Sequence, residues 1–140
     1  MTGIYDIVMM ALAVWREDRG GSYQSRLGVA FVIYNRMNDK RWPDKASQVI
    51  LQHNQFSSFL AGDPNATKFP VPGSGEFGAF DECLKLATDL LGEGPPVGGD
   101  PTAGANFYHS FSDPTSPHWP TWATDDTFTA KLDGLSFYKR

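Results

Sequence analysis

The sequence contains almost no cysteine, because Cys83 is the only one among 140 residues. A single thiol excludes a disulfide within the chain, so the fold is not held by a disulfide framework. Cys83 shares the apolar face of a predicted helix with Phe80 and Leu84, whereas a reactive thiolate needs an exposed or electropositive setting. We therefore interpret Cys83 as a small core residue and not as the nucleophile of a cysteine peptidase.

Long hydrophobic runs are also absent. A membrane-spanning helix needs about 20 consecutive apolar residues, and no stretch of this chain approaches that length. The stretch from Met1 to Ala13 has no basic leader and contains Asp6, so we interpret it as folded structure and not as a signal peptide. The sequence therefore predicts no membrane insertion.

Basic residues are fewer than acidic ones: the chain has 12 Lys and Arg and 16 Asp and Glu, which gives a formal net charge of -4. Nucleic-acid binding depends on several cations along one track. The only modest cluster is Arg36, Lys40 and Arg41, which is typical of a solvated helix end. We predict no nucleic-acid partner.

The sequence has only three histidines, His53, His109 and His118. Their spacing matches no zinc motif, so a zinc enzyme is a weak alternative. We predict neither a metal nor another cofactor.

Helical periodicity dominates the first two thirds of the chain. Apolar residues recur at the spacing of one helix face in Ile4, Ile7, Val8, Ala11, Leu12 and Trp15, and Ser22 can cap a second helix that ends at about Met37. Shorter patterns predict a helix around 46–50 and a core helix over 77–91 that ends at Gly92. Segment 55–60 is predicted to be an exposed strand or extended loop, and 106–109 a short strand. We predict one α+β domain spanning 1–140.

Glu17 stands at the end of the first predicted helix, just before the Gly20-Gly21 break. A helix C-terminus disfavours negative charge by about 0.3–1 kcal/mol, so the position suggests a function. Burial beside Trp15 would raise the pKa of this carboxyl group, which suits an acid that donates a proton. The alternative is a solvated acid at a helix end. We expect Arg16 and Arg19 to point away from Glu17, and Arg19 to form an ion pair.

Aromatic residues crowd the last third of the chain among Pro and Ser. Sugar rings have apolar faces that stack on such side chains, so a glycan groove is one hypothesis. The alternative is that these rings seal a loop-rich region. They are Phe107, Tyr108, Phe111, Trp119, Trp122, Phe128, Phe137 and Tyr138.

Four segments, taken in order, resemble the SleB-like cell-wall hydrolases, a family of spore-cortex lytic enzymes and related peptidoglycan hydrolases. The ordered set is more specific than any one motif, and it covers nearly the whole chain. The resemblance implies a lysozyme-like fold, with a mainly helical core and a small β-sheet or extended region beside the cleft. The segments are Glu17–Gly21 with Gly28–Arg36, then Gln55–Ser57, Asp100–His109 and Phe137–Tyr138.

The resemblance implies a lytic transglycosylase that cleaves the MurNAc-GlcNAc bond of peptidoglycan glycan strands with one acid. Glu17 would protonate the leaving oxygen and then take the proton of the muramoyl C6 hydroxyl, which closes onto C1 and leaves a 1,6-anhydromuramoyl end. The same resemblance implies that sugar is held by Gln55, Ser57, Asn106, Phe107 and Tyr108.

One departure from the family leaves alternatives open, because Gly21 stands where the family usually carries a second acid. Hydrolysis by two carboxylates would need a partner about 5–9 Å from Glu17, and no candidate among Asp18, Glu76, Glu82 and Asp100 is singled out. Asp100 is most simply a turn residue. A non-catalytic glycan-binding or structural virion component with the same fold is a further alternative.

The biological setting that we expect is a phage or prophage lysin acting on the cell wall or periplasm, and the alternative is a bacterial protein exported by another route. Such a lysin would leave the host cytoplasm by holin-type release or be carried on the virion. We expect a monomer.

Overall fold

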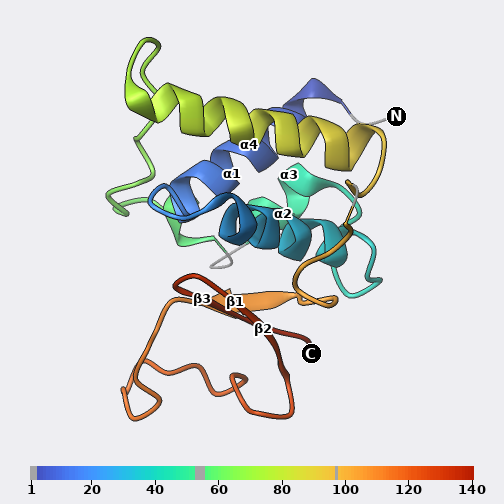
Figure 1. Cartoon of the computed structure of the whole chain (residues 1–140), viewed down its shortest axis with the longest axis vertical. Coiled ribbons are helices and arrows are strands. Elements are labelled where there is room, and N and C mark those ends of the chain that lie inside the picture. The colour runs from blue at the N-terminus through green and yellow to red at the C-terminus, as the bar shows by residue number, and fades with distance from the viewer. Residues whose placement is uncertain (1–2, 53–55, 97) are drawn as a thin grey trace.

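The computed structural model describes residues 3–52, 56–96 and 98–140. In this part of the chain, a group of helices lies against a small antiparallel sheet (Figure 1), which confirms the α+β prediction. No helix among these residues is both long and apolar enough to cross a membrane. The elements are α1 (Ile4–Glu17), α2 (Tyr23–Met37), α3 (Ala46–Ile50), η1 (Ser57–Phe59), α4 (Gly75–Gly92), β1 (Phe107–His109), β2 (Phe128–Leu132) and β3 (Leu135–Tyr138).

The turn between α1 and α2 is fixed by a capping box, as the sequence predicted for Ser22. The Ser22 hydroxyl accepts from the backbone N–H of Ser25 at 3.2 Å, and the Ser22 N–H donates to the Ser25 hydroxyl at 3.0 Å. This reciprocal pair satisfies two of the donors that a helix N-terminus leaves free. Glu17, the last residue of α1, is therefore connected by a short turn to the fixed start of α2.

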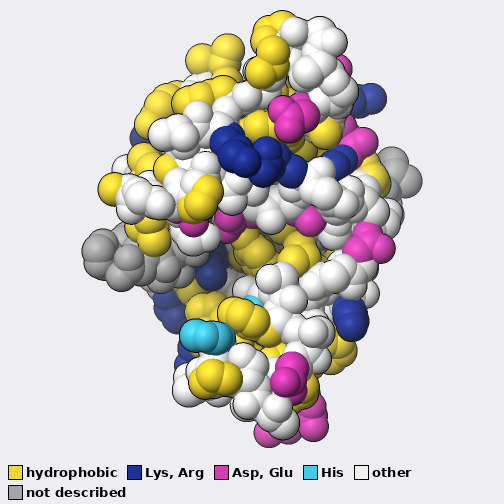
Figure 2. All heavy atoms as spheres, turned by 90° about the vertical axis from the view of Figure 1, so that its left-hand side faces the viewer, with side chains coloured by type: hydrophobic (Ala, Val, Ile, Leu, Met, Phe, Trp, Pro, Cys, Tyr) yellow, Lys and Arg dark blue, Asp and Glu magenta, His cyan; other side chains and the backbone are white. Residues whose placement is uncertain are grey.

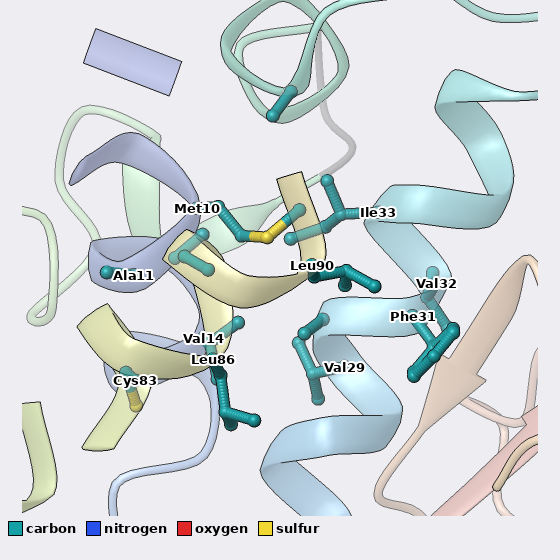
Figure 3. Close-up of a cluster of buried hydrophobic side chains, with 14 of the residues drawn as sticks. Met10, Ala11, Val14, Val29, Phe31, Val32, Ile33, Cys83, Leu86 and Leu90 are labelled. Atoms are coloured by element: carbon teal, nitrogen blue, oxygen red, sulfur yellow. The ribbon is translucent and has the colours of Figure 1, made fainter. Parts of the chain in front are cut away.

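The hydrophobic core lies between α1, α2 and α4 (Figure 3). Cys83 is fully buried there, and burial raises the pKa of its thiol to about 12, which confirms a core role and not a nucleophile. Figure 3 shows side chains from all three helices pointing into this cluster, among them Met10, Val14, Val29, Ile33, Leu86 and Leu90.

The apolar face predicted for α1 is buried toward its C-terminal end and exposed at its N-terminal end. Ile4 is 79% exposed and Val8 is 41% exposed. The second half of α1, from Met10 to Arg16, is buried on every side, because α2, α3, α4 and η1 all contact this helix. Glu17 therefore follows a segment that the core holds rigidly.

The sheet has the order β1-β3-β2, with antiparallel neighbours. Phe137 of the central strand is fully buried and faces Gly28 of α2. A Cβ at Gly28 would lie 2.6 Å from Cζ of Phe137, so the missing side chain allows α2 to approach the sheet closely. In register with Phe137, β1 carries Tyr108.

Two loop predictions have different outcomes. Segment 57–59 forms a 3₁₀ turn, so the predicted strand or extended loop is wrong there, while residues 53–55 lie outside the described part. Asp100 is the turn residue expected, because its carboxylate accepts from the backbone N–H of Thr102 at 2.8 Å and of Gly104 at 3.0 Å. Asn35 of α2 also donates to it at 2.9 Å, which ties this turn to the helices.

Candidate active site

Glu17 and Tyr108 are 91 residues apart in the sequence and in contact in the fold. The hydroxyl of Tyr108 donates a hydrogen bond of 2.8 Å to Oε1 of Glu17. α1 brings the carboxylate from the helical part, and β1 brings the phenol from the sheet. Because both supports are packed against the core, this pair has a fixed geometry.

The protonation of Glu17 is set by opposing effects. Burial raises the pKa of the carboxyl group and is the largest cause, and the charge of Asp63 adds to the rise. The hydrogen bond from Tyr108 and the polar contact with Ser58 lower the pKa, because they favour the charged form. The net shift is upward, so Glu17 holds its proton to higher pH than an ordinary glutamate, as a general acid requires.

A cleft surrounds this pair, at the junction of the helical part and the sheet. Figure 2 shows hydrophobic side chains exposed in the hollow between these two parts. Its volume is about 550 Å³, and its wall includes Ser57 and Asn65 from the helical side and Phe107, Phe111 and Trp122 from the sheet side. The cleft therefore combines one acid with polar groups and aromatic rings.

A second hollow adjoins the first on another side of Glu17. Its volume is about 660 Å³, and its wall includes Asp18, Gly21 and Asp133. Glu17, Ser110 and Leu135 line both hollows. A chain-like ligand could thus extend to either side of the Glu17 carboxylate.

Arg16 fixes one wall of the cleft to α1. Its Nε donates to the carbonyl oxygen of Lys68 at 3.0 Å, and its Nη1 donates to that of Ser58 at 3.4 Å. The guanidinium carbon also lies 4.8 Å from the ring centroid of Phe59 and 4.9 Å from that of Phe69. The loop that carries Ser58 is therefore held beside Glu17.

Arg19 adds a second attachment to the same loop. Its Nη2 donates to Oδ1 of Asn65 at 3.2 Å, and its Nη1 lies 3.7 Å from Oε1 of Glu76. The ion pair predicted for Arg19 is confirmed. Neither arginine makes a hydrogen bond or ion pair with Glu17 among the described residues, so the carboxyl group keeps its raised pKa.

Arg36 is a cleft residue that sequence reasoning missed. It is only 4% exposed, so its interpretation as part of a solvated helix end is wrong. Its Nε donates to the carbonyl oxygen of Asn106 at 2.7 Å, and its guanidinium carbon lies 4.9 Å from the ring centroid of Phe107. Burial lowers its pKa to about 10, which leaves a positive charge in the cleft at neutral pH. Its position three residues after buried Ile33 is the signal that could have identified it.

The predicted substrate residues do not all gather in the cleft. Ser57, Phe107 and Tyr108 line it together with Glu17. Asn106 does not, because its side chain pairs with the backbone of Arg140, donating to the carbonyl oxygen at 2.8 Å and accepting from the N–H at 2.9 Å. Gln55 lies outside the described residues.

The comparisons with known proteins identify the family of this chain. The family model described as Cell Wall Hydrolase matches residues 20–138. The chain belongs to the cell wall hydrolase family. As a member of that family, it is 34% identical to the spore cortex-lytic enzyme of Halalkalibacterium halodurans over 112 residues, and 30% identical to that of Oceanobacillus iheyensis over 115 residues. Each match covers 79% of this chain, which spans only about a third of those relatives, 29% and 34% of their lengths.

Solved structures show the same fold for this cell wall hydrolase. The catalytic domain of the germination-specific lytic transglycosylase SleB from Bacillus anthracis superposes with a TM-score of 0.70 at 27% identity, covering 98% of this chain and 96% of that one. The catalytic domain of the Bacillus cereus SleB protein gives a TM-score of 0.68 at 27% identity, covering 99% and 93%. The fold predicted from the resemblance is confirmed.

His109 has a structural role in this cell wall hydrolase. Its Nδ1 accepts from the backbone N–H of Phe111 at 3.0 Å, and its Nε2 lies 2.8 Å from the hydroxyl of Tyr138. Both ring nitrogens are thus occupied, and burial lowers the pKa of the imidazole. No cluster of three metal-ligating side chains occurs in the described ranges, while His53 lies outside them.

The aromatic residues of the cell wall hydrolase divide between the two roles considered from the sequence. Phe137 and Tyr138 are buried and belong to the packing of the sheet. Phe107, Phe111 and Trp122 line the cleft instead, and the rings of Phe107 and Trp122 lie 4.9 Å apart between centroids. These three rings offer apolar surface of the kind that sugar faces stack on.

Replacing Tyr108 with Phe should move the alkaline limb of the pH–activity profile to higher pH. The phenol donates to the Glu17 carboxylate and so lowers its pKa; without this bond, Glu17 keeps its proton further into the alkaline range. The measurement is the pH dependence of the peptidoglycan-cleavage rate. Tyr34→Phe on α2, outside both hollows, is the matched control. An unchanged or acid-shifted limb would contradict the prediction.

Proposed function

We propose that the chain is a peptidoglycan glycosidase that acts as a lytic transglycosylase, cleaving the MurNAc-GlcNAc bond and leaving 1,6-anhydromuramoyl ends. The observation that carries this proposal is the Glu17–Tyr108 pair, placed between two adjoining hollows. Glu17 is the only carboxylate among the described residues that line the first hollow. The relatives named as spore cortex-lytic enzymes and the SleB lytic transglycosylase fold support the same reaction class.

Glu17 performs both proton transfers in this mechanism. Its carboxylic acid protonates the glycosidic oxygen as the bond to the muramoyl C1 breaks, and positive charge develops at C1. The C6 hydroxyl oxygen of the same sugar then bonds to C1 and gives its proton to the Glu17 carboxylate. The acid is thereby regenerated without water, and the hydrogen bond from Tyr108 keeps the carboxylate oriented in both steps.

Substrate binding in this proposal relies on the cleft walls. Ser57 and Asn65 offer hydrogen bonds to sugar hydroxyls, while Phe107 and Trp122 offer ring faces. Asn106 would act indirectly, since its side chain holds the C-terminal Arg140. The predicted role of Gln55 in binding sugar remains a part of this proposal.

The products of peptidoglycan digestion test the proposal. Purified peptidoglycan is incubated with the protein, and the released muropeptides are identified by mass spectrometry. We expect anhydromuramoyl ends, which are one water lighter than reducing ends. Reducing muramoyl ends would show hydrolysis instead, and binding to peptidoglycan without release would favour a non-catalytic glycan-binding module.

The lysin setting, with holin-type release or carriage on a virion, stays a prediction. It is tested by expressing the chain in a bacterial host with and without a holin. Lysis only in the presence of the holin would support that setting.

A further inference from the structure

The side chain of Asp18 fills the space next to Gly21. A Cβ at Gly21 would overlap both carboxylate oxygens of Asp18. Gly21 does not have a positive φ, so the backbone conformation does not demand glycine there. A side chain at position 21 would therefore have to displace the Asp18 carboxylate from its present position.

This carboxylate is held in place and lines the second hollow beside Glu17. The hydroxyl of Ser25 donates to Oδ2 of Asp18, and Ser25 itself is locked in the capping box of α2. Arg26 fixes the backbone of Asp18 by donating from Nε to its carbonyl oxygen at 3.2 Å. Asp18 is thus a carboxylate on rigid supports, directly after the acid of the cleft.

One oxygen of Asp18 remains available for a ligand. In the described ranges, the hydrogen bonds to this carboxylate engage Oδ2 alone, and no ion pair there includes Asp18. The hollow that Asp18 lines also contains Gly20, Gly21 and Gly134, which have no side chains to obstruct a ligand. A carboxylate oxygen in such a setting is a strong acceptor for hydroxyl or amide N–H groups.

We propose that Asp18 is a substrate-binding residue of the cleft, and that its Oδ1 accepts a hydrogen bond from a hydroxyl or N-acetyl N–H of the sugar bound in the second hollow. The proposal rests on the proposed function, because it assigns that hollow to the glycan strand on one side of the cleaved bond. In the present arrangement, the Asp18 carboxylate lies in the space beside Gly21 and faces the second hollow.

Substitutions at the two positions test this inference. Asp18→Ala should lower kcat/KM for peptidoglycan by about 10- to 100-fold, the range for losing a hydrogen bond to a charged group, mainly through KM. Asp18→Asn keeps an oxygen acceptor of the same size, so its loss should be smaller. Gly21→Ala should also lower kcat/KM, because the new Cβ displaces the Asp18 carboxylate.

The controls separate binding from folding and from the proposed function. Asp81→Ala, on the exposed face of α4, should keep wild-type kinetics, and the Tm of each variant reports folding. Wild-type KM and kcat in Asp18→Ala would overturn the inference, as would a loss that only follows a lowered fraction of folded protein. If the wild type itself releases no muropeptides, it is the proposed function that fails and not the role of Asp18 alone.

Discussion

Replacing Glu17 with Gln is expected to lower the rate of peptidoglycan cleavage by about 10²- to 10⁴-fold, the usual contribution of a general acid–base residue. Gln has nearly the same shape, and its amide oxygen can still accept from Tyr108, so the cleft keeps its form. The variant lacks the proton that the leaving oxygen must receive. Release of muropeptides, followed by chromatography, measures the loss.

The matched control for this prediction is Glu93→Gln. Glu93 follows α4, is exposed and lines neither hollow, so its loss of charge should leave the rate unchanged. A Glu17→Gln variant that retains cleavage would show that another group donates the proton. Asp18 would then be the first candidate, because it follows Glu17 directly and lines the adjoining hollow.

The same substitution should stabilise the folded protein at neutral pH. Burial raises the pKa of Glu17 in the folded state, so the unfolded chain releases this proton more easily, and stability falls as pH rises through the folded pKa. The glutamine of the variant carries no charge to bury. The Tm of Glu17→Gln should exceed that of the wild type at neutral pH, and the difference should shrink below the unfolded pKa of about 4.3. An equal Tm at every pH would contradict this explanation.

The elements that could be predicted from sequence are those set by local periodicity. The helix ending at Gly92 was predicted correctly, because its apolar residues repeat at helical spacing. The same rule failed for Ile4 and Val8, since a pattern shows which face is apolar and not how far the neighbouring elements extend along it. Periodicity therefore located the helices, while packing decided which of their residues are buried.

The site was predictable only in part, for a related reason. Glu17 could be identified from its place at a helix end, and Tyr108 from the family resemblance, but their hydrogen bond depends on how β1 meets α1. The burial of Arg36 and the pairing of Asn106 with Arg140 also arise from tertiary contacts. The contact between the Asp18 carboxylate and Gly21 depends on the path of the chain between α1 and α2, so residue spacing does not predict it.

Replacing Phe137 with Ala is expected to lower the free energy of unfolding by about 3–5 kcal/mol, as for other buried Phe→Ala changes. The ring is fully buried and fills the space that Gly28 leaves between α2 and the sheet. Small domains have only about 5–15 kcal/mol of stability in total, so the variant should approach unfolding at moderate temperature. Urea denaturation followed by circular dichroism gives the value.

Phe128→Ala is the control, because it makes the same change in the same sheet at a residue that is 47% exposed. It should cost only about 1 kcal/mol, in proportion to the apolar area that it buries. Similar losses in both variants would contradict the packing described for the centre of the sheet.

The Phe137→Ala variant also tests whether packing in the core affects the rate of cleavage. The ring of Phe137 lies 6.0 Å from that of Tyr108 between centroids, and Tyr108 in turn holds the Glu17 carboxylate. A cavity at Phe137 gives Tyr108 room to move, and misplacement of a positioning group by about 1 Å can cost 10²-fold in rate. At a temperature where the variant is still folded, its cleavage rate should therefore fall well below that of Phe128→Ala. A rate that simply follows the folded fraction would show that the phenol is held by its hydrogen bond alone.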